Sequence, residues 1–265
     1  MNRVCCIVVS SDAYLNKYKV LQSSIQIHLP NIDSILYYTG TNYLSDIDNV
    51  QYISHWLKNT IYNNELYKHC SIRPQAVLDA FAKGYEKVIL VGADTEWFSY
   101  PKECIESLDK NDCFVTMYTH EPYSDENLYG NNIQVVLNGQ INADCIAFKN
   151  TPKVIKWLEW VDKQTKTYCK VKDVEFVDQL WFSTCFSMLE NVYICRHLGY
   201  NVASYNAVNR GCDFINKKMK DQSPLVLYHY DGLEKGKEEL VSKHQNRYKA
   251  KNDWLQFLKD YTNKL

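Results

Sequence analysis

The chain has 265 residues, with 30 Lys and Arg against 31 Asp and Glu, so its formal net charge is −1 at pH 7. This balance argues against a strongly electrostatic partner such as a nucleic acid. Only nine Gly and six Pro occur, which excludes long flexible linkers and low-complexity tails. Neither a Gly-rich dinucleotide fingerprint nor a P-loop is present. We expect one compact domain. If this domain binds a nucleotide, it uses neither of these two motifs.

The longest apolar run, Val4–Val9, stands near the N-terminus. It is far shorter than the ~20 residues of a membrane span, and no basic segment or small-residue cleavage site accompanies it. The run therefore predicts a buried strand, and a cytoplasmic location is the default expectation. Ten cysteines occur without the spacing of a zinc site, so we expect reduced thiols in the core rather than disulfides.

In the first half of the chain, apolar runs alternate with segments of helical periodicity. The predicted strands are Val4–Ser10, Ser34–Tyr38, Val50–Ile53 and Lys87–Val91, and the predicted helices are Tyr14–His28 and Arg73–Lys83. Pro74 would lie in the first turn of the second helix, and Gly84 would follow its last turn. This alternation predicts an α/β fold with a mostly parallel central sheet flanked by helices.

The second half is less regular. Strands are predicted at Phe114–Tyr118 and Cys145–Phe148, with a polar surface loop at Thr119–Asn132 between them. Helices are predicted from Pro152 onward and over Val174–Phe186, followed by extended segments at Val192–Cys195 and Leu225–Tyr228. The last thirty residues have the spacing of an amphipathic helix.

Polar side chains follow three of the predicted strands, at residues 10–12, 92–96 and 228–231, where ligands collect in open α/β sheets. Asp94 and Glu96 come directly after an apolar strand, and paired carboxylates suit Mg²⁺ or Mn²⁺. His229 is a third candidate ligand. Gly232 would let backbone N–H groups approach a phosphate, and Lys235 would neutralise it. The alternatives are an ordinary acidic turn and a buried structural histidine.

Several segments, in order, resemble those of glycosyltransferase family 8, the glycogenin-like enzymes with the GT-A fold. The matching segments are VVSSDAYLNKYKVLQSSI, KVILVGADTEWFS, NGQINADCIAFKNTPKVIKWLEW, EFVDQLWFS, GYNVASYNAVNR and LVLYHYDGLEK, and together they cover roughly residues 3–236. The resemblance implies a GT-A domain over residues 1–236 and a C-terminal helical extension over residues 237–265, packed on the same domain.

The resemblance also implies roles for individual residues. Tyr14 would stack on the nucleotide base, with Asp12 and Ser10 in the same nucleotide-binding turn. Asp94 and His229 would bind a metal ion, to which the carboxylate spacing adds Glu96 as a candidate ligand. The remaining positions are grouped by role: Gly232 and Lys235 at the diphosphate; Asn142 and Asp144 at the donor sugar; Arg73 near the donor sugar or phosphate; and Asp178 with Gln179 at the reacting anomeric carbon.

Several positions depart from the family pattern, among them Asn16 in place of a lysine and Gly236-Lys237 in place of Pro-Trp. Gly92 stands where the first acid of the Asp-x-Asp motif is expected, so Asp94 matches the second acid and Glu96 is displaced from the lost position by two residues. Asp144 stands where many relatives have glycine, which would change sugar preference or supply an acceptor contact.

The resemblance implies a hexosyltransferase-like glycosyltransferase that uses a UDP-sugar and Mn²⁺ or Mg²⁺, with retention of configuration favoured. The acceptor would be a glycan, a lipid-linked sugar or a protein. The alternative is a catalytically inactive nucleotide-sugar or glycan-binding protein of the same fold. The basic C-terminal segment would either cap the core or make a peripheral membrane contact.

Overall fold

The computed structural model describes residues 3–59, 62, 64–119, 137, 139–168, 170–171, 174–175, 177–234, 236 and 251–265. These residues form two compact units. The first comprises Met1–Ala13, Asn31–Gly92 and Lys102–Cys195, and the second comprises Tyr14–Pro30, Ala93–Pro101 and Arg196–Leu265. The boundary at residue 236 inferred from the family resemblance stays a prediction.

The first unit is built on a seven-stranded sheet in the order β10-β6-β7-β4-β1-β2-β3. The strands are β1 (Val4–Ser10), β2 (Asp33–Tyr38), β3 (Val50–Tyr52), β4 (Lys87–Val91), β6 (Cys113–Met117), β7 (Ile141–Lys149) and β10 (Val192–Cys195). β7 is antiparallel to both of its neighbours, and the remaining pairings are parallel. The expected mostly parallel sheet is confirmed.

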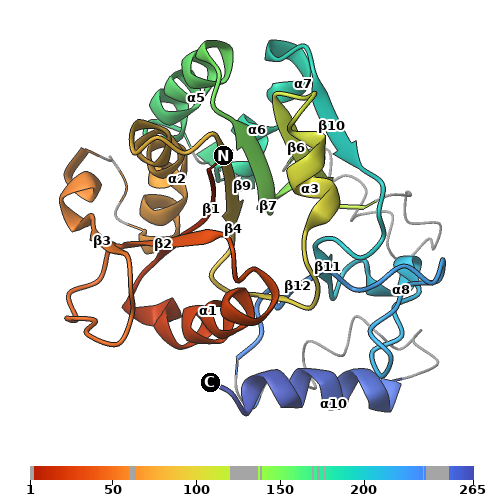
Figure 1. The fold of residues 1–265 in the computed structure, drawn as a ribbon. Coiled ribbons are helices and arrows are strands. Elements are labelled where there is room, and N and C mark those ends of the chain that lie inside the picture. The colour runs from red at the N-terminus through yellow and green to blue at the C-terminus, as the bar shows by residue number, and fades with distance from the viewer. Residues whose placement is uncertain are drawn as a thin grey trace. The chain divides into compact units, whose positions relative to one another are not determined.

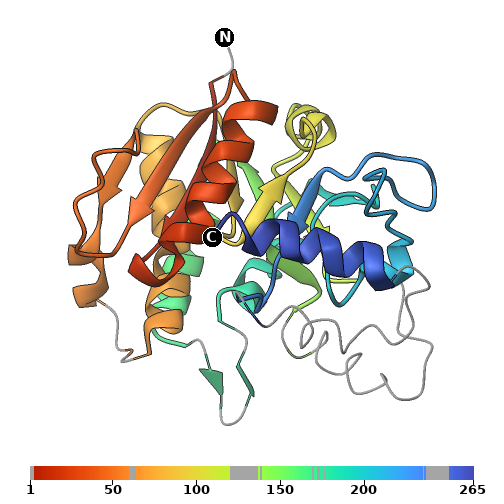
Figure 2. The same ribbon diagram turned by 90° about the horizontal axis from the view of Figure 1, so that it is seen from below.

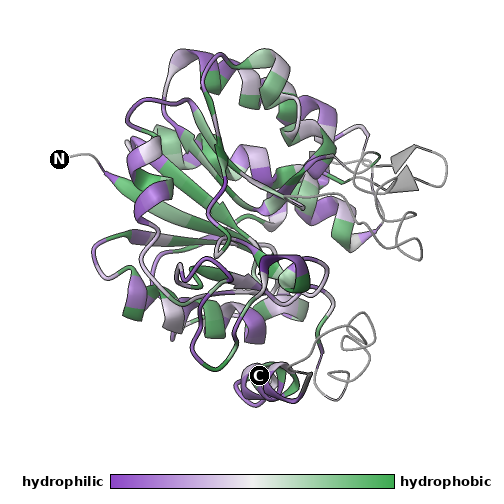
Figure 3. Cartoon of the chain, turned by 90° about the vertical axis from the view of Figure 1, so that its right-hand side faces the viewer, coloured by the Kyte–Doolittle hydropathy of each residue, from purple (hydrophilic) through white to green (hydrophobic). Residues whose placement is uncertain are grey.

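One face of this sheet packs against α2 (Glu65–Ala82) and α5 (Pro152–Thr165), which lie side by side (Figure 1). Alternate strand residues such as Ile7 and Leu90 meet Val77 of α2 and Leu158 of α5 in the main core. Every residue of β4 is buried, as expected for a central strand covered on both faces. Figure 3 shows the strands in the middle of this sheet coloured mainly as hydrophobic.

The helix that carries Arg73 starts earlier than predicted. It begins at Glu65, where the Asn64 side chain accepts a hydrogen bond from the backbone N–H of Leu66 at 2.8 Å, so Pro74 lies inside the helix. Proline removes one backbone donor and disfavours the preceding turn, which is why the sequence favoured a start there. The tertiary packing of Ile72, Val77 and neighbouring residues keeps the helix continuous.

The predicted helix over Val174–Phe186 is wrong. The structure has a strand β9 (Val174–Glu175) paired with β8 (Lys170–Val171), and then two short helices, α6 (Gln179–Phe182) and α7 (Cys185–Met188). Val177 has φ of 41°, a left-handed conformation that is strained for a β-branched residue and incompatible with a continuous helix. The helical periodicity in the sequence therefore reflects two short helices, whose buried residues Phe182 and Cys185 both belong to the main core.

The remaining elements of the first unit are two 3₁₀ turns, η1 (Asp12–Tyr14, which continues into the second unit) and η2 (Ser54–Asn59), and the helix α3 (Lys102–Ser107). Nine cysteines in the described part of the chain are buried thiols, in agreement with the expected reduced core thiols. The predicted loop Thr119–Asn132 lies outside the described residues except for Thr119.

The second unit contains α1 (Leu15–His28), the three-stranded sheet β11-β12-β5, α8 (Ala207–Arg210) and α10 (Lys251–Thr262). Its strands are β5 (Thr95–Trp97), β11 (Val202–Ala203) and β12 (Leu227–His229), with β12 antiparallel to β5 and parallel to β11. Figure 2 shows α10 along one side of this unit, with the C-terminus beside α1. No described helix has the length and apolar character needed to cross a membrane.

Helix α10 is held by an aromatic core. Trp254 is fully buried and donates a hydrogen bond from Nε1 to the Tyr228 hydroxyl at 3.0 Å. The rings of Tyr230 and Tyr261 stack with their centroids 3.5 Å apart, and Phe257 packs against both Tyr228 and Tyr230. The helix therefore caps the core of the second unit. The basic segment before Lys251 that would meet a membrane lies outside the described residues.

Candidate functional site

In the first unit, one arginine faces two aspartates that come from different elements. Arg73, in the middle of α2, places NH1 3.0 Å from Asp178 Oδ2 and NH2 3.3 Å from Asp144 Oδ1. The same NH2 donates to the Ala143 carbonyl at 2.6 Å. We call Arg73, Asp144 and Asp178 the arginine cluster. These three residues were each predicted as site residues, and the structure brings them together.

The two carboxylates of the arginine cluster differ in their exposure. The Asp178 side chain is 1% exposed, whereas the Asp144 side chain is 28% exposed. Burial raises the pKa of Asp178 above its ordinary value, Arg73 opposes this shift, and the charge of Asp144 adds to it. Asp178 is thus the inner partner that fixes Arg73, and Asp144 is the carboxylate that solvent or a ligand can reach.

Two amide side chains accompany the arginine cluster. Gln179 Oε1 accepts from the Ala143 N–H at 3.4 Å, and its Nε2 donates to the Gly139 carbonyl at 3.5 Å. Asn142 is buried, and its Oδ1 accepts from the Asp144 N–H at 2.9 Å. These two hydrogen bonds of Gln179 are long and therefore weak.

At the end of β1, Asp12 is bound to the loop that follows β2. Its carboxylate accepts hydrogen bonds from the Tyr38 hydroxyl, the Asn42 side chain and the Thr41 backbone N–H, the last at 3.1 Å. The Tyr38 hydrogen bond is the main cause of a lowered Asp12 pKa. Ser10 is buried, and its carbonyl accepts from the backbone N–H and the hydroxyl of Thr39. Both residues therefore shape one turn.

In the second unit, Asp94 and His229 form a pair with 3.6 Å between Asp94 Oδ1 and His229 Nε2. The antiparallel register of β5 and β12 places His229 opposite Thr95, and the Tyr230 N–H donates to the Asp94 carbonyl at 2.8 Å. Each of the two side chains is largely buried, 13% and 6% exposed respectively. Two candidate ligands separated by 135 positions, 229 − 94, thus meet through one strand pairing.

Lys17 joins this pair from the first turn of α1. Its Nζ lies 3.9 Å from Asp94 Oδ2 and 4.9 Å from the centroid of the Tyr14 ring. Tyr14 is 38% exposed. Lys17 was not among the predicted site residues, although its position three residues after Tyr14 places both on one helical face. That spacing is the signal in the sequence that identifies Lys17.

The Asp94 and His229 pair fits a divalent cation that takes its other ligands from elsewhere. Two groups bound about 2.1 Å from one ion at angles of 90–120° lie roughly 3.0–3.6 Å apart, and the observed separation is 3.6 Å. Within the described residues, no group of three or more His, Cys, Asp or Glu side chains is placed to hold a metal ion. Phosphate oxygens and water would have to complete the coordination.

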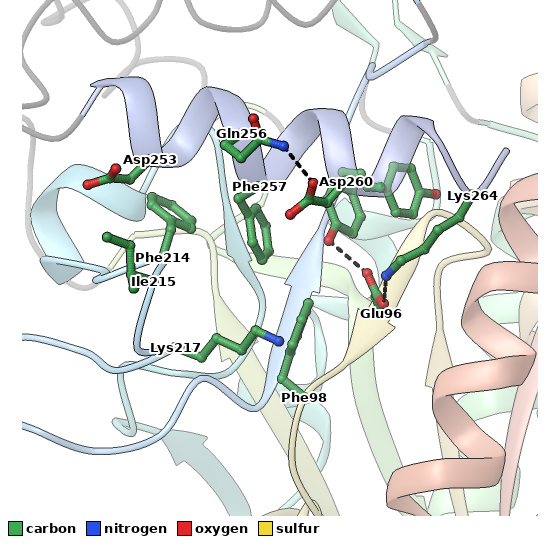
Figure 4. A pocket seen from close by; sticks show the side chains of 12 residues that line it. Glu96, Phe98, Phe214, Ile215, Lys217, Asp253, Gln256, Phe257, Asp260 and Lys264 are labelled. Atoms are coloured by element: carbon green, nitrogen blue, oxygen red, sulfur yellow. Dashed lines mark hydrogen bonds and ion pairs between the residues drawn. The ribbon is translucent and has the colours of Figure 1, made fainter.

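Glu96 is not brought together with Asp94 and His229 in such a group. Its Oε2 accepts from the Tyr230 hydroxyl at 2.8 Å, and its Oε1 lies 2.5 Å from Lys264 Nζ, as Figure 4 shows. This carboxylate borders a pocket of about 390 Å³ between β5, the segment at Phe214 and α10. Glu96 therefore ties the end of α10 to β5.

The two predicted diphosphate contacts differ in what the structure describes. Gly232 has φ of 66°, and no atom lies within 4 Å of where its Cβ would stand. Its backbone is therefore open to a ligand, as expected for a glycine that approaches a phosphate. Lys235 lies outside the described residues.

Comparison with solved structures identifies the fold. The galactosyltransferase LgtC in complex with donor and acceptor sugar analogues has a TM-score of 0.54 and 14% identity, with 98% of this chain and 95% of LgtC covered. An active-site variant of LgtC, in which glutamate replaces a glutamine, gives a TM-score of 0.55, 13% identity and coverage of 98% and 99%. The bifunctional glycosyltransferase WbbM has a TM-score of 0.52 and 17% identity, with 88% of this chain but only 46% of WbbM covered.

No protein-family model and no curated protein sequence matches the chain. The structural similarity at these low identities concerns the arrangement of the backbone, and the glycosyltransferases that share it have the GT-A architecture. The predicted fold is confirmed: this chain has the GT-A fold.

Proposed function

We propose that the protein transfers a sugar from a UDP-sugar with the assistance of a divalent metal ion. The observation that carries the proposal is the Asp94 and His229 pair, whose 3.6 Å separation fits one ion. It occurs on a fold shared with LgtC, which was solved with donor and acceptor sugar analogues. A carboxylate and an imidazole together suit Mn²⁺, and a carboxylate with phosphate oxygens suits Mg²⁺.

The leaving group of this reaction is a diphosphate, on which negative charge builds as the anomeric C–O bond breaks. Asp94 and His229 would hold the ion, and Lys17 and Lys235 would add positive charge to the diphosphate. A bound Mn²⁺ or Mg²⁺ stabilises that charge as a Lewis acid. The open backbone at Gly232 gives the phosphates N–H donors at close approach. Glu96 stays a proposed ligand, and its removal tests whether it reaches the ion.

The first unit supplies the sugar-binding groups in this proposal. Arg73, Asn142 and Asp144 would contact the donor sugar, while Asp178 holds Arg73 in place. Gln179 is assigned to the face of the anomeric carbon, because it directly follows Asp178 of the arginine cluster and its amide contacts Ala143, the neighbour of Asp144. A glutamine is also the residue replaced in the active-site variant of LgtC.

We assign retention of configuration to the reaction, in line with the resemblance to family 8. NMR of the product anomer tests this assignment. An α product from an α-linked donor supports it, and a β product contradicts it.

The nucleotide would be held by the turn at the end of β1. Tyr14 presents an exposed ring for stacking on the base, and Asp12 and Ser10 shape the adjoining turn. The acceptor in this proposal is a hydroxyl of a glycan, a lipid-linked sugar or a protein.

A second candidate function is nucleotide-sugar or glycan binding without catalysis. The observation that favours it is that the described residues place only two candidate ligands together, with Gly92 where an acid was expected. Hydrolysis of the donor separates the two functions, because a transferase slowly loses its donor to water in the presence of Mn²⁺ and a binding protein does not.

Donor binding tests the assignment of Asp94 and His229. Calorimetric titration of UDP-galactose and UDP-glucose, with Mn²⁺ and with EDTA, is expected to show metal-dependent binding to the wild-type protein. Asp94→Asn and His229→Asn should each abolish the effect of Mn²⁺ on donor affinity. Glu96→Gln should abolish it only if Glu96 also binds the ion. The exposed Asp48 supplies a matched control, Asp48→Asn. Unchanged metal dependence in Asp94→Asn and His229→Asn would overturn the assignment.

A further inference from the structure

Gly92 directly follows the last residue of β4 and lies opposite Asp144, which is inside the neighbouring strand β7. In the antiparallel register of β4 and β7, Val91 pairs with Cys145, and the Gly92 N–H donates to the Asp144 carbonyl at 3.2 Å. A Cβ added to Gly92 would stand 2.6 Å from Asp144 Oδ1 and 2.9 Å from its Cγ. The Asp144 carboxylate therefore fills the space that any side chain at position 92 would need.

The backbone itself does not require glycine at this position. Gly92 does not have the positive φ found at five other glycines of the chain, so alanine could adopt its conformation. The reason that remains is steric. A Cβ at position 92 would stand closer to the Asp144 carboxylate than non-bonded contact distances allow. Because Gly92 has no side chain, it leaves a gap in which the Asp144 carboxylate lies against the end of β4.

The position of this carboxylate is also fixed by charge. Asp144 shares Arg73 with the buried Asp178. One guanidinium thus faces two carboxylates, and of these the Asp144 carboxylate, 28% exposed, is the one that a ligand can reach. An ionised carboxylate accepts hydrogen bonds and donates none. The group suits sugar hydroxyls and repels a second anion.

We propose that Asp144, seated in the gap left by Gly92, makes the donor site specific for a neutral sugar and excludes a sugar acid such as a uronic acid. This inference rests on the proposed function, because it assumes that the arginine cluster faces the donor sugar. Arg73 does not offset the exclusion, because both of its terminal nitrogens already face carboxylates. Specificity of this kind comes from a repulsive group directed against the wrong ligand.

UDP-glucose and UDP-glucuronic acid test the inference, because they differ only in a CH₂OH or a carboxylate at C6 of the sugar. Calorimetry in the presence of Mn²⁺ would measure both donors and UDP alone. Like charges brought close together in a largely buried site repel strongly enough to weaken binding on the order of tenfold or more. The wild-type protein is expected to bind UDP-glucose at least about tenfold more tightly than UDP-glucuronic acid.

Two variants remove the carboxylate from its place by different means. Asp144→Asn removes the charge, and Gly92→Ala pushes the flexible carboxylate away while the backbone conformation is kept. Both should bring the preference for UDP-glucose close to unity. Glu106→Gln removes an exposed carboxylate elsewhere on the first unit and should keep the wild-type preference. Circular dichroism would verify that each variant is folded.

The outcomes separate this inference from the proposed function. If UDP and every UDP-sugar fail to bind, the proposed function is overturned and the inference with it. If UDP-glucose and UDP-glucuronic acid bind equally well to the wild-type protein, the proposed function stands and the role of Asp144 is refuted. A wild-type preference that survives in both variants would also refute it.

Discussion

Replacement of Arg73 by methionine should destabilise the protein strongly, because it leaves Asp178 buried without its ion-pair partner. The Asp178 side chain is 1% exposed and lies 3.0 Å from the guanidinium. At an effective dielectric constant of about 20, this contact corresponds to roughly 5 kcal/mol of attraction before the cost of desolvation. Removal of one member of a buried ion pair typically costs about 3–5 kcal/mol. We expect Arg73→Met to lower the free energy of unfolding by that amount at neutral pH.

The pH dependence of this loss has a definite sign. The pKa of Asp178 is raised in the folded protein by burial, and loss of Arg73 would raise it further. In the unfolded chain this carboxyl titrates near the ordinary value of about 3.9. The folded state therefore holds the proton more tightly, and stability is lost as the pH rises from about 4 through the raised pKa. The loss of unfolding free energy caused by Arg73→Met should therefore be larger at pH 7.5 than at pH 4.5.

Urea unfolding followed by circular dichroism at both pH values measures this deficit. The double variant Arg73→Met/Asp178→Asn is the control, because it removes both charges and should recover at least half of the loss. The reasoning is refuted if Arg73→Met costs less than about 1 kcal/mol at pH 7.5, or if the double variant is no more stable than the single one.

Two further predictions concern the second unit and the helix of Gln179. Trp254→Ala should cost about 3–5 kcal/mol, because it empties a fully buried site, whereas the exposed Gln256→Ala should cost little. Limited proteolysis measures this effect. The α10 helix should be cleaved faster in Trp254→Ala than in the wild-type protein, and at the wild-type rate in Gln256→Ala. Gly139 has φ of 96°, and an added Cβ would lie 2.5 Å from Ser183 Oγ. Gly139→Ala should lower the free energy of unfolding by at least about 1–2 kcal/mol and slow single-turnover sugar transfer. An unchanged free energy of unfolding would contradict this prediction.

The parts of the fold that the sequence predicts well are those with strong local signals. Val4–Ser10 and Lys87–Val91 are apolar runs that end at polar residues, and both form strands with those bounds. The start of α2 was missed because Pro74 is a strong local marker of a helix start, whereas packing of the helix against the sheet overrides it. The positive φ of Val177 has no signal in the sequence.

The site shows the same division between local and long-range information. Asp94, His229, Arg73 and Asp178 were predicted as site residues, and the structure joins them in two pairs. The partners of Glu96 could not be predicted, because Lys264 lies 168 residues further along the chain.

The contact between Gly92 and Asp144 depends on the antiparallel pairing of β4 with β7. In the sequence these residues stand as two separate departures from a family pattern. Only the strand register brings them together, so their relationship was not predictable from the sequence alone.

The rate of UDP release from UDP-galactose and UDP-glucose in the presence of Mn²⁺ tests the proposed glycosyltransferase activity most directly. We predict slow release by the wild-type protein that is accelerated by a suitable acceptor and stopped by EDTA. Asp94→Asn should lower the rate on the order of 10²–10³-fold, as for loss of one charge-stabilising group, with an unchanged circular dichroism spectrum. Absence of release with every donor, or equal rates in Asp94→Asn and the wild-type protein, would contradict the proposed function.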